Sequence, residues 1–440
     1  MTPADAPGPA AVDASGRAEA LFRAALGLAT LAMLGLSWPL WVEPSAFPRV
    51  PFVRGLPAPP AGASWLLFGL LIAGVAAGLV RRGMIGASLL PLVVLIAQDQ
   101  HRFQPWIYQY GMIGLALATL GPRRALAGAR LFVIALYFHS GLSKLDASFA
   151  TELGPTFLAT ALAPLGLEPR AWSAPARTAA ALAMPLAELA VAVGLAIPRA
   201  RRWALAGAVA LHAALIGILG PWGLGHSAIV LVWNAALIVE DLILFGPGPV
   251  PPPEDGSPAE ADTRLAPVAH AALVLAAVLP LGERWGLFDS WPSFALYASH
   301  AERTEVFLHE DDLGAYPESI RRHLAGAAGL SPWRRLDLTG WSRTGRGVPV
   351  YPQGRAGNGV AEALAARYRG ALPVRVIQWG RADALAARRR RNEVYGLDAI
   401  RRLGNRYRLN AHPSARWVDQ IFTAENAETA ERKREGKNRN

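Results

Sequence analysis

Long apolar stretches separated by short polar connections fill the chain up to residue 283. Most of these stretches are close to the ~20 residues that a helix needs to cross the hydrocarbon core of a bilayer, and several are shorter. The pattern therefore predicts about nine membrane-spanning helices, at residues 19–40, 64–80, 84–98, 105–120, 125–145, 176–197, 203–220, 225–245 and 266–283. A cleaved signal peptide is the alternative interpretation of the first stretch, but no convincing small-residue cleavage site follows it.

After the last apolar stretch the pattern becomes that of a mixed domain. Residues 304–308 and 372–377 predict strands, and helix-like patterns occur at 317–325, 357–369 and 395–403. The predicted fold class is thus mainly α: a polytopic membrane helix bundle of about nine spans, with a small C-terminal α+β domain outside the membrane.

The remaining segments have compositions of their own. The N-terminus is rich in Ala, Pro and Gly, and the C-terminus is polar and highly charged, so we predict disorder at both ends. A Pro-rich segment before the last span predicts a stiff linker. The predicted organisation is a disordered N-terminus at 1–18, an eight-span domain at 19–245, a linker at 246–265, a last span at 266–283, an α+β domain at 284–424 and a disordered tail at 425–440.

Arginines in the short connections predict the orientation of the bundle. They lie in alternate connections, on one side of the membrane: Arg81, Arg82, Arg123, Arg124, Arg130, Arg199, Arg201 and Arg202. Because short cytoplasmic loops accumulate Lys and Arg, this side is predicted to be cytoplasmic. With nine spans, the N-terminus is then cytoplasmic and the C-terminal domain lies in the periplasm or an equivalent space, which predicts a multi-pass protein of the cell (inner) membrane.

The composition agrees with a membrane protein and limits its chemistry. Hydrophobic residues make up 52% of the chain and charged residues 18%, which is more apolar than a soluble domain. Cysteine is absent, so disulfide and thiolate chemistry within this chain is excluded.

The C-terminal part is basic and contains the run Arg388–Arg391. We expect this run to form a solvated helix face or to contact anionic lipid headgroups. The partners we predict are the lipid bilayer, with anionic headgroups or a periplasmic protein, and no nucleic acid.

Lys144 is the candidate catalytic residue. It ends an apolar stretch and is the only lysine before Lys433, although arginine could anchor a helix end equally well and cannot readily lose its proton. Ser140 lies one turn earlier on the same helix face, and His139 and Ser143 form another such pair. Lys144, assisted by His139, is therefore a candidate general base. The alternative is a lysine whose amine simply reaches the membrane interface.

The connection between the spans at 84–98 and 105–120 is dense in polar and aromatic groups. Its candidate ligand-binding residues are Asp99, His101, Gln104, Trp106 and Tyr108. They could line a polar mouth above the bundle for a flat organic ligand, or they could form only a tight external turn. No metal-ligand spacing surrounds His101, so we predict no metal site.

Several polar residues interrupt the spans themselves. A carboxylate at mid-bilayer needs a proton or a cation, and Lys144 is a candidate partner of Glu188 if their helices pack together. For His212 and Asn234 we expect hydrogen bonds between helices. Glu240 and Asp241 lie near the predicted cytoplasmic end of their span, where we expect solvated interface residues.

The stretch Tyr137-Phe-His-Ser-Gly-Leu-Ser-Lys-Leu-Asp-Ala147 resembles a motif in the membrane region, or HTTM domain, of vitamin K-dependent gamma-glutamyl carboxylases. The loop from Asp99 to Gly111 is similar to the loop before that family's lysine helix, with Trp106 in place of a functional histidine. The resemblance implies that Lys144 acts as a base on a hydroquinone.

A helix ending in Lys144, followed by a helix carrying Glu188, is also similar to the DoxX/MauE group of redox-associated membrane proteins. Two hypotheses follow. In the first, Lys144, with Ser140, Glu188 and Asn234 nearby, binds or deprotonates a quinone- or hydroquinone-like ligand in a quinol-dependent oxidoreductase or carboxylase-like enzyme. In the second, the bundle is a non-enzymatic anchor, DoxX/MauE-like or part of a complex, that presents a basic external domain to a partner.

Overall fold

The computed structural model describes residues 9–42, 47–57, 59–60, 62–247, 262–326, 331–368 and 372–415. Of the segments predicted to be disordered or linking, residues 1–8 and 425–440 and most of the linker at 246–265 lie outside the described residues. The first helix already begins at Pro9, within the segment 1–18 that was predicted to be disordered.

All nine predicted spans are helical. They correspond to α1 (Pro9–Leu36), α3 (Ala63–Val80), α4 (Ile85–Gln98), α5 (Pro105–Thr119), α6 (Pro122–Ser143), α8 (Ala174–Ala196), α9 (Arg201–Leu219), α10 (Ala228–Phe245) and α11 (Ala266–Val278). Within the described residues, seven helices are long and apolar enough to cross a membrane, whereas α4 and α5 are shorter. The chain is therefore a multi-pass membrane protein, and its apolar outer faces contact the lipid bilayer.

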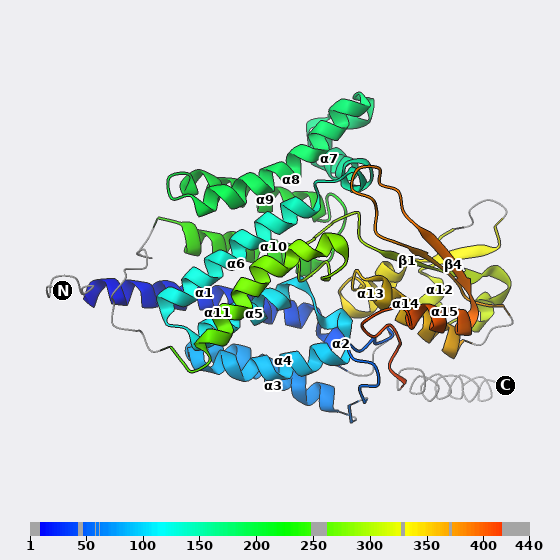
Figure 1. The fold of residues 1–440 in the computed structure, drawn as a ribbon, viewed down its shortest axis with the longest axis horizontal. Coiled ribbons are helices and arrows are strands. Elements are labelled where there is room, and N and C mark those ends of the chain that lie inside the picture. The colour runs from blue at the N-terminus through cyan, green and yellow to red at the C-terminus, as the bar shows by residue number, and fades with distance from the viewer. Residues whose placement is uncertain are drawn as a thin grey trace, which may run out of the picture.

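Helix α6 lies at the centre of the bundle. In its most apolar 18-residue window, 67% of the residues are buried, against 28–44% for the other candidate spans. It packs against α1, α5, α8, α10 and α11, and a short helix, α7 (Gly154–Leu162), extends from the connection between α6 and α8 (Figure 1). The motif that ends in Lys144 is thus carried by the most enclosed of the seven candidate spans.

Gly141 allows α6 and α8 to approach closely. A Cβ atom at this position would lie 2.8 Å from the carbonyl oxygen of Pro185 and 2.9 Å from Cγ of Leu189. Small residues at such crossings permit tight packing of membrane helices. This contact sets the distance between Lys144 at the end of α6 and Glu188 on α8.

We expect Gly141→Val to push α6 and α8 apart and to destabilise the protein by about 1–3 kcal/mol, the usual cost of overpacking. Thermal unfolding in detergent would measure this loss. Gly111→Ala is the control, because its Cβ would meet only Cδ2 of Leu92 at 3.8 Å, an ordinary contact. Equal stability of the two variants would contradict the role of Gly141.

The C-terminal domain is built on a four-stranded antiparallel sheet with the strand order β2-β1-β3-β4. The strands are β1 (Arg303–His309), β2 (Trp333–Leu336), β3 (Arg375–Trp379) and β4 (Arg391–Tyr395), and the helices are α12 (Glu318–Arg321), α13 (Leu338–Arg346), α14 (Gly354–Arg367) and α15 (Gly396–Gly404). Val306, Leu308 and Val376 share a buried core with Val360 of α14 and Ile400 of α15. The predicted strand at 304–308 and the predicted helices at 357–369 and 395–403 are therefore confirmed, whereas the predicted strand at 372–377 begins only at Arg375 and the predicted helix at 317–325 is reduced to the four residues of α12.

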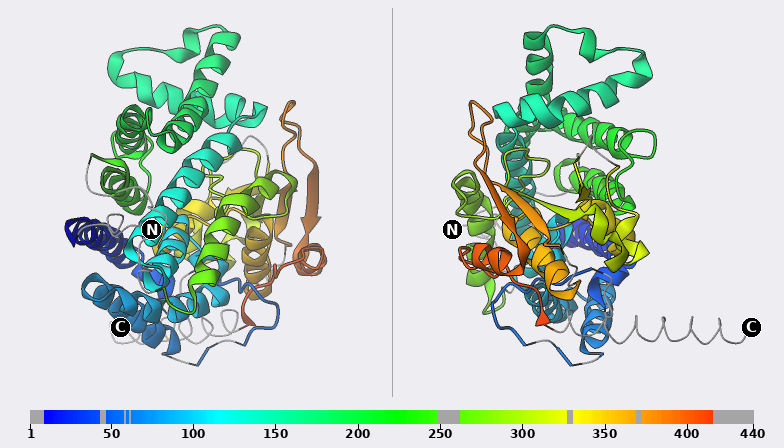
Figure 2. Two further views of the ribbon diagram at one scale, coloured as in Figure 1. Left: turned by 60° about the vertical axis from the view of Figure 1, so that its left-hand side comes forward. Right: turned by 90° about the vertical axis from the view of Figure 1, so that its right-hand side faces the viewer.

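The hydrophobic core of the C-terminal domain also contains residues from the N-terminal part of the chain. Phe47 and Val50, from the connection after the short helix α2 (Trp38–Trp41), are fully buried in it. In Figure 1 the domain covers one end of the bundle, and the right-hand view of Figure 2 faces this covered end. The bundle and the domain are thus joined by shared packing.

The prediction that Arg388–Arg391 forms a helix face is wrong. The run leads from the β3–β4 connection into β4, which begins at Arg391. Arg389 is turned inward, and its Nη1 donates to the carbonyl oxygens of Ala301 at 2.8 Å and Gly380 at 3.0 Å. The connection between β3 and β4 determines the positions of these arginines, and a helical pattern of residues could not predict this.

Candidate functional site

A cavity of about 920 Å³ opens between α6, α8, α9 and α10 and reaches the underside of the C-terminal domain. Most of its wall is apolar. Its polar side chains inside the bundle are Gln104, Tyr137, Ser140, Lys144, Glu188, His212 and Asn234. A mostly apolar cavity with a few converging polar groups is the usual form of a small-molecule site.

Lys144 and Glu188 form a buried ion pair on the cavity wall. Nζ of Lys144 lies 2.7 Å from Oε2 and 3.0 Å from Oε1 of Glu188, so the conditional prediction of this pair is confirmed. The same Nζ donates to the carbonyl oxygen of Ser140 at 2.8 Å and to its Oγ at 2.7 Å. Only 5% of the Lys144 side chain and 11% of the Glu188 side chain is exposed.

This arrangement satisfies the ammonium group fully. Lys144 closes α6 as its C-cap residue, so its side chain can turn back over the last turn to Ser140. Glu188, near the middle of α8, supplies the carboxylate, next to the close contact between α6 and α8 that Gly141 permits. A paired, hydrogen-bonded charge can be buried where a lone charge could not, and the pair can both orient a polar ligand and exchange a proton with it.

A second polar group lies deeper in the bundle. Oη of Tyr137 lies 2.6 Å from Nε2 of His212 and 2.5 Å from Oδ2 of Asp241, and Nδ1 of His212 lies 2.8 Å from Oδ1 of Asn234. The predicted interhelical bonds of His212 and Asn234 are therefore confirmed. The prediction that Glu240 and Asp241 are solvated is wrong, because their exposures are 1% and 0%; helix packing covers this end of α10.

The opposite wall of the cavity is made of small residues. They are Ala187, Ala190 and Gly194 of α8 and Gly207 and Ala210 of α9. Ala187, Ala190 and Ala210 are also exposed, and both of their helices are candidate membrane spans. A long hydrocarbon group could enter the cavity sideways from the bilayer.

The connection from α11 to β1 and helix α13 roof the cavity. Trp291 and Tyr297 come from the connection, and Arg343 comes from α13. Tyr297 has a φ of +59°, a left-handed conformation that costs a non-glycine residue about 1–3 kcal/mol and is held by its surroundings. The roof is therefore a constrained structure directly above the polar groups.

Arg343 and His226 meet at the rim of the roof. Nη2 of Arg343 lies 3.0 Å from Nε2 of His226. Burial, and then the nearby Arg343 charge, lower the pKa of His226 to about 4. His226 is thus neutral near pH 7 and accepts from the guanidinium, which leaves a positive charge at the cavity rim.

The cavity collects only part of the predicted site. Lys144, Ser140, Glu188, Asn234, Gln104 and Trp106 line it, and Nε1 of Trp106 has no hydrogen-bond partner among the described residues. His139 does not line it. Its Nε2 contacts the carbonyl oxygen of Ala277 on α11 at 2.8 Å, because one residue along a helix turns a side chain by about 100°.

Asp99, His101 and Tyr108 also lie outside the cavity lining. Asp99 accepts from the backbone amides of Val50 and His101, and Nδ1 of His101 accepts from the amide of Tyr351 at 3.1 Å. Burial, and then Arg346, lower the pKa of His101 to about 3, so it stays neutral as an acceptor. This part of the 98–110 connection fastens the C-terminal domain to the bundle instead of binding a ligand.

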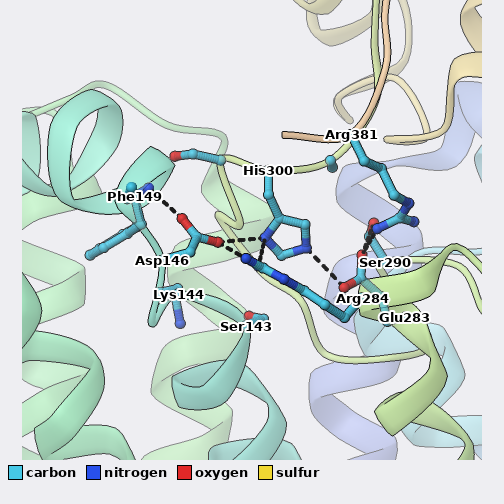
Figure 3. A network of polar contacts seen from close by, with 12 residues as sticks. Ser143, Lys144, Asp146, Phe149, Glu283, Arg284, Ser290, His300 and Arg381 are labelled. Atoms are coloured by element: carbon cyan, nitrogen blue, oxygen red, sulfur yellow. Dashed lines mark hydrogen bonds and ion pairs between the residues drawn. The ribbon is translucent and has the colours of Figure 1, made fainter. Parts of the chain in front are cut away.

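A buried charge network fastens the domain next to Lys144 as well. Asp146 accepts from Nδ1 of His300 at 2.8 Å and from Nη1 of Arg284 at 2.7 Å. Nε2 of His300 donates to Oε2 of Glu283 at 2.9 Å, and Arg381 binds the other oxygen of Glu283. Figure 3 shows Lys144 pointing away from this network, into the bundle.

His300 is held as an imidazolium, because both ring nitrogens face carboxylates. Burial alone would lower its pKa, but the hydrogen bonds to Asp146 and Glu283 outweigh it and raise the pKa above 6.5. Burial would raise the pKa of Asp146, but hydrogen bonds from His300, Arg284 and the Phe149 amide lower it below 3.8. The His300 imidazolium and the Asp146 carboxylate are therefore both charged at pH values between 3.8 and 6.5.

We expect the docking of the C-terminal domain to weaken with rising pH. A raised pKa means that His300 contributes stability below 6.5, and this contribution is lost as the pH rises through the higher folded-state value. The Asp146 contribution is lost only in acid, as the pH falls through its lowered pKa. Protection factors from hydrogen exchange of residues 287–300, in which the intrinsic pH dependence of exchange cancels, should fall between about pH 6 and about pH 9. The His300→Gln variant should have low protection at both values; the same fall in the variant would contradict this role.

Sequence reasoning missed several residues that line or support the cavity. Tyr137 stands inside the lysine motif but was not selected, and Arg343, His226, Trp291 and Tyr297 lie far from it in sequence. Asp241 was noticed in the sequence, but its place near the end of its span favoured a solvated residue over a buried one. No comparable signal marks the roof, because its residues meet only through the docking of the C-terminal domain.

Residues 122–239 match the family model described as methylamine utilisation protein MauE. This segment runs from the start of α6 into α10, so it carries Lys144, Glu188, His212 and Asn234, most of the polar groups inside the bundle. The match supports the DoxX/MauE part of the resemblance and not the carboxylase part. No curated protein and no solved structure matches the chain.

Proposed function

We propose that this chain is a redox-associated membrane protein, similar in role to MauE-like proteins, whose bundle binds a quinone- or hydroquinone-like amphiphile. The MauE-like segment supports a membrane protein of this group. The observation that carries the ligand class is one cavity that combines a buried polar end with a wall of small apolar residues open towards lipid. A polar aromatic head and a long hydrocarbon tail match these two parts.

The polar end of the cavity suits an oxygen-bearing ring. The indole nitrogen of Trp106, which has no partner among the described residues, can donate, and Glu188 can accept. The aromatic side chains of Trp106 and Trp233 add surfaces for a flat ring. We propose that the ring lies among these groups while the tail follows α8 and α9.

The test is to purify the protein in mild detergent and analyse the extracted small molecules by mass spectrometry. We expect an isoprenoid quinone or a related aromatic lipid with the wild type, and a large loss from the variant carrying Lys144→Met and Glu188→Leu together. Both changes keep side-chain volume, so the fold is preserved. Bulk phospholipid alone in both preparations would contradict the proposal.

A role for Lys144 as a base is the second candidate. It is favoured by the Glu188 carboxylate, which can take the ammonium proton and leave a neutral amine facing the cavity. Lys144→Arg keeps a cation beside Glu188 but does not give up its proton readily. We expect this variant to retain the ligand and to lose ligand oxidation; unchanged turnover would exclude the base role.

The alternative in which the bundle only anchors a separable binding domain has less support from the packing. Phe47 and Val50 complete the core of the C-terminal domain, and Asp146, Glu283 and Arg284 bind His300 and Arg381. We propose instead that the domain is the fixed roof of the ligand site. A protein partner would then dock on its outer surface.

We propose an external location for this roof. Arg82 donates to the carbonyl oxygen of Leu117, and Arg124 pairs with Asp262 near the start of α11. These contacts gather the arginine-rich connections at the end of the bundle away from the C-terminal domain, which by the positive-inside rule supports an external location of the domain. Cysteine labelling at position 385, with an impermeant reagent on intact cells, would test this orientation.

A further inference from the structure

The hydroxyl of Tyr137 makes more hydrogen-bond contacts, with His212 and Asp241, than its single hydrogen can supply. Tyr137 Oη makes two short contacts, with His212 Nε2 at 2.6 Å and with Asp241 Oδ2 at 2.5 Å. Each contact needs one hydrogen, and a tyrosine hydroxyl carries only one. A second hydrogen must therefore come from His212 or from Asp241.

Asn234 determines how His212 takes part. Its Nδ2 donates to the carbonyl oxygen of Val230 at 2.8 Å, so its Oδ1 faces His212 as an acceptor. Nδ1 of His212 is then the N–H that donates to Asn234. The extra proton consequently lies either on Nε2 of His212 or on the carboxyl group of Asp241.

The surroundings favour the proton on Asp241. Its side chain is 0% exposed, and Oδ1 has no hydrogen-bond partner among the described residues. Burying an oxygen without a hydrogen-bond partner costs much less free energy in a neutral carboxylic acid than in a carboxylate. No Lys or Arg in the described ranges forms an ion pair with Asp241 or with its neighbour Glu240, whose Oε2 accepts from Gln109 at 2.5 Å.

The other charged groups of the adjoining helices are already engaged. Glu188 on α8 pairs with Lys144, and Glu19 on α1 pairs with Arg23 at 3.1 Å. Nε of Arg130 on α6 donates to the carbonyl oxygen of Leu244 at 2.7 Å. Asp241 thus faces Tyr137 from α6, His212 from α9 and Glu240 from its own helix, without a compensating cation.

We propose that Tyr137, His212 and Asp241 are a proton-relay triad that moves one proton between buried Asp241 and His212 on the cavity wall. At rest Asp241 is protonated and donates to Tyr137, which donates to a neutral His212. When the proton leaves Oδ2 of Asp241 for Oη of Tyr137, Tyr137 passes its own proton to Nε2 of His212. The products are a carboxylate and an imidazolium, so the total charge of the triad does not change.

This transfer matters for the cavity because Tyr137 and His212 line it, whereas Asp241 lies behind them. The triad can place a positive imidazolium on the cavity wall when a bound group becomes anionic, and it can return to rest when that group is neutral again. The proton count depends only on the contacts of the triad. It therefore goes beyond the proposed quinone-like ligand and does not require it.

The test is infrared spectroscopy of the full-length protein in lipid nanodiscs without added ligand. We expect the wild type to show the carbonyl stretching band of a buried carboxylic acid, one component of which is missing from Asp241→Asn. On transfer to D₂O this component should exchange roughly 10-fold or more slowly in Tyr137→Phe than in the wild type, because the route through the cavity wall is broken.

Tyr110→Phe is the matched control. Tyr110 is a buried tyrosine whose Oη lies 2.7 Å from Oγ of Ser88, and it does not line the cavity. We expect its spectrum and exchange to follow the wild type. An Asp241→Asn spectrum identical to that of the wild type, or equal exchange in Tyr137→Phe, would overturn the proposal, whereas loss of the quinone-like ligand alone would leave it standing.

Discussion

Replacing Glu188 with leucine lowers the unfolding free energy by about 3–5 kcal/mol, because it leaves the Lys144 ammonium buried without its carboxylate. The geometry makes this the largest single effect we expect. Both side chains are buried, and Nζ of Lys144 lies within hydrogen-bond distance of both oxygens of Glu188. Thermal unfolding in detergent, followed by circular dichroism, would measure the loss.

The second substitution identifies the cause. Adding Lys144→Met removes the unpaired charge, and replacing a buried ion pair by apolar groups of similar volume is often neutral or stabilising. We therefore expect the double variant to regain most of the lost stability. Arg303→Met is the control, because its pair with Glu152 is 48% and 36% exposed, and exposed pairs contribute only about 0–1 kcal/mol. A double variant as unstable as Glu188→Leu would show that the charge is not the cause.

We expect that filling the small-residue wall excludes the proposed quinone-like ligand. Ala210 lies on α9 where the cavity meets the lipid-facing surface. We expect Ala210→Trp to occupy the space of the hydrocarbon tail and to lower the amount of co-purified ligand roughly 10-fold or more, since a ligand is excluded when its pocket is filled. Mass spectrometry of extracts, normalised to protein, would measure it.

Ala206→Trp is the matched control for this experiment. Ala206 lies on the same helix and is exposed, but it does not line the cavity. The two variants therefore make the same substitution in the same kind of helix surface. We expect Ala206→Trp to retain the ligand and both variants to unfold at similar temperatures. Equal retention by both would mean that the cavity is not the site of the ligand.

The positions of the nine apolar helices could be predicted because hydrophobic runs of this length have few alternatives in a bilayer. The buried partner of Lys144 could be predicted for the same reason, since an unpaired Glu188 at mid-span would be too costly. In the C-terminal domain, β1 and β3 were predicted, whereas β2, β4 and α13 were not. These three have short or charged sequences, and pairing with neighbouring strands or packing under the bundle decides their structure.

The loop from Asp99 to Tyr108 shows what local sequence could not decide. Its polar residues fit a ligand site and a structural turn equally well, and the tertiary structure divides them. Gln104 and Trp106 face the cavity, whereas His101 binds Tyr351 and Asp99 binds Val50 and lies 3.5 Å from Arg346. The separation depends on partners that lie between 49 and 250 residues away in the chain.

By itself, the sequence determined that this protein is a helical membrane bundle with a mixed C-terminal domain, and it made Lys144 a candidate partner of Glu188. The physical reason is the high cost of exposing backbone or leaving a charge unpaired in lipid, which leaves local patterns few alternatives. Only the tertiary structure decided that Asp241 is buried behind Tyr137 and that the C-terminal domain roofs the cavity. Those contacts depend on helix rotation and domain docking, where many arrangements satisfy the same hydrophobic pattern and only side-chain packing selects one.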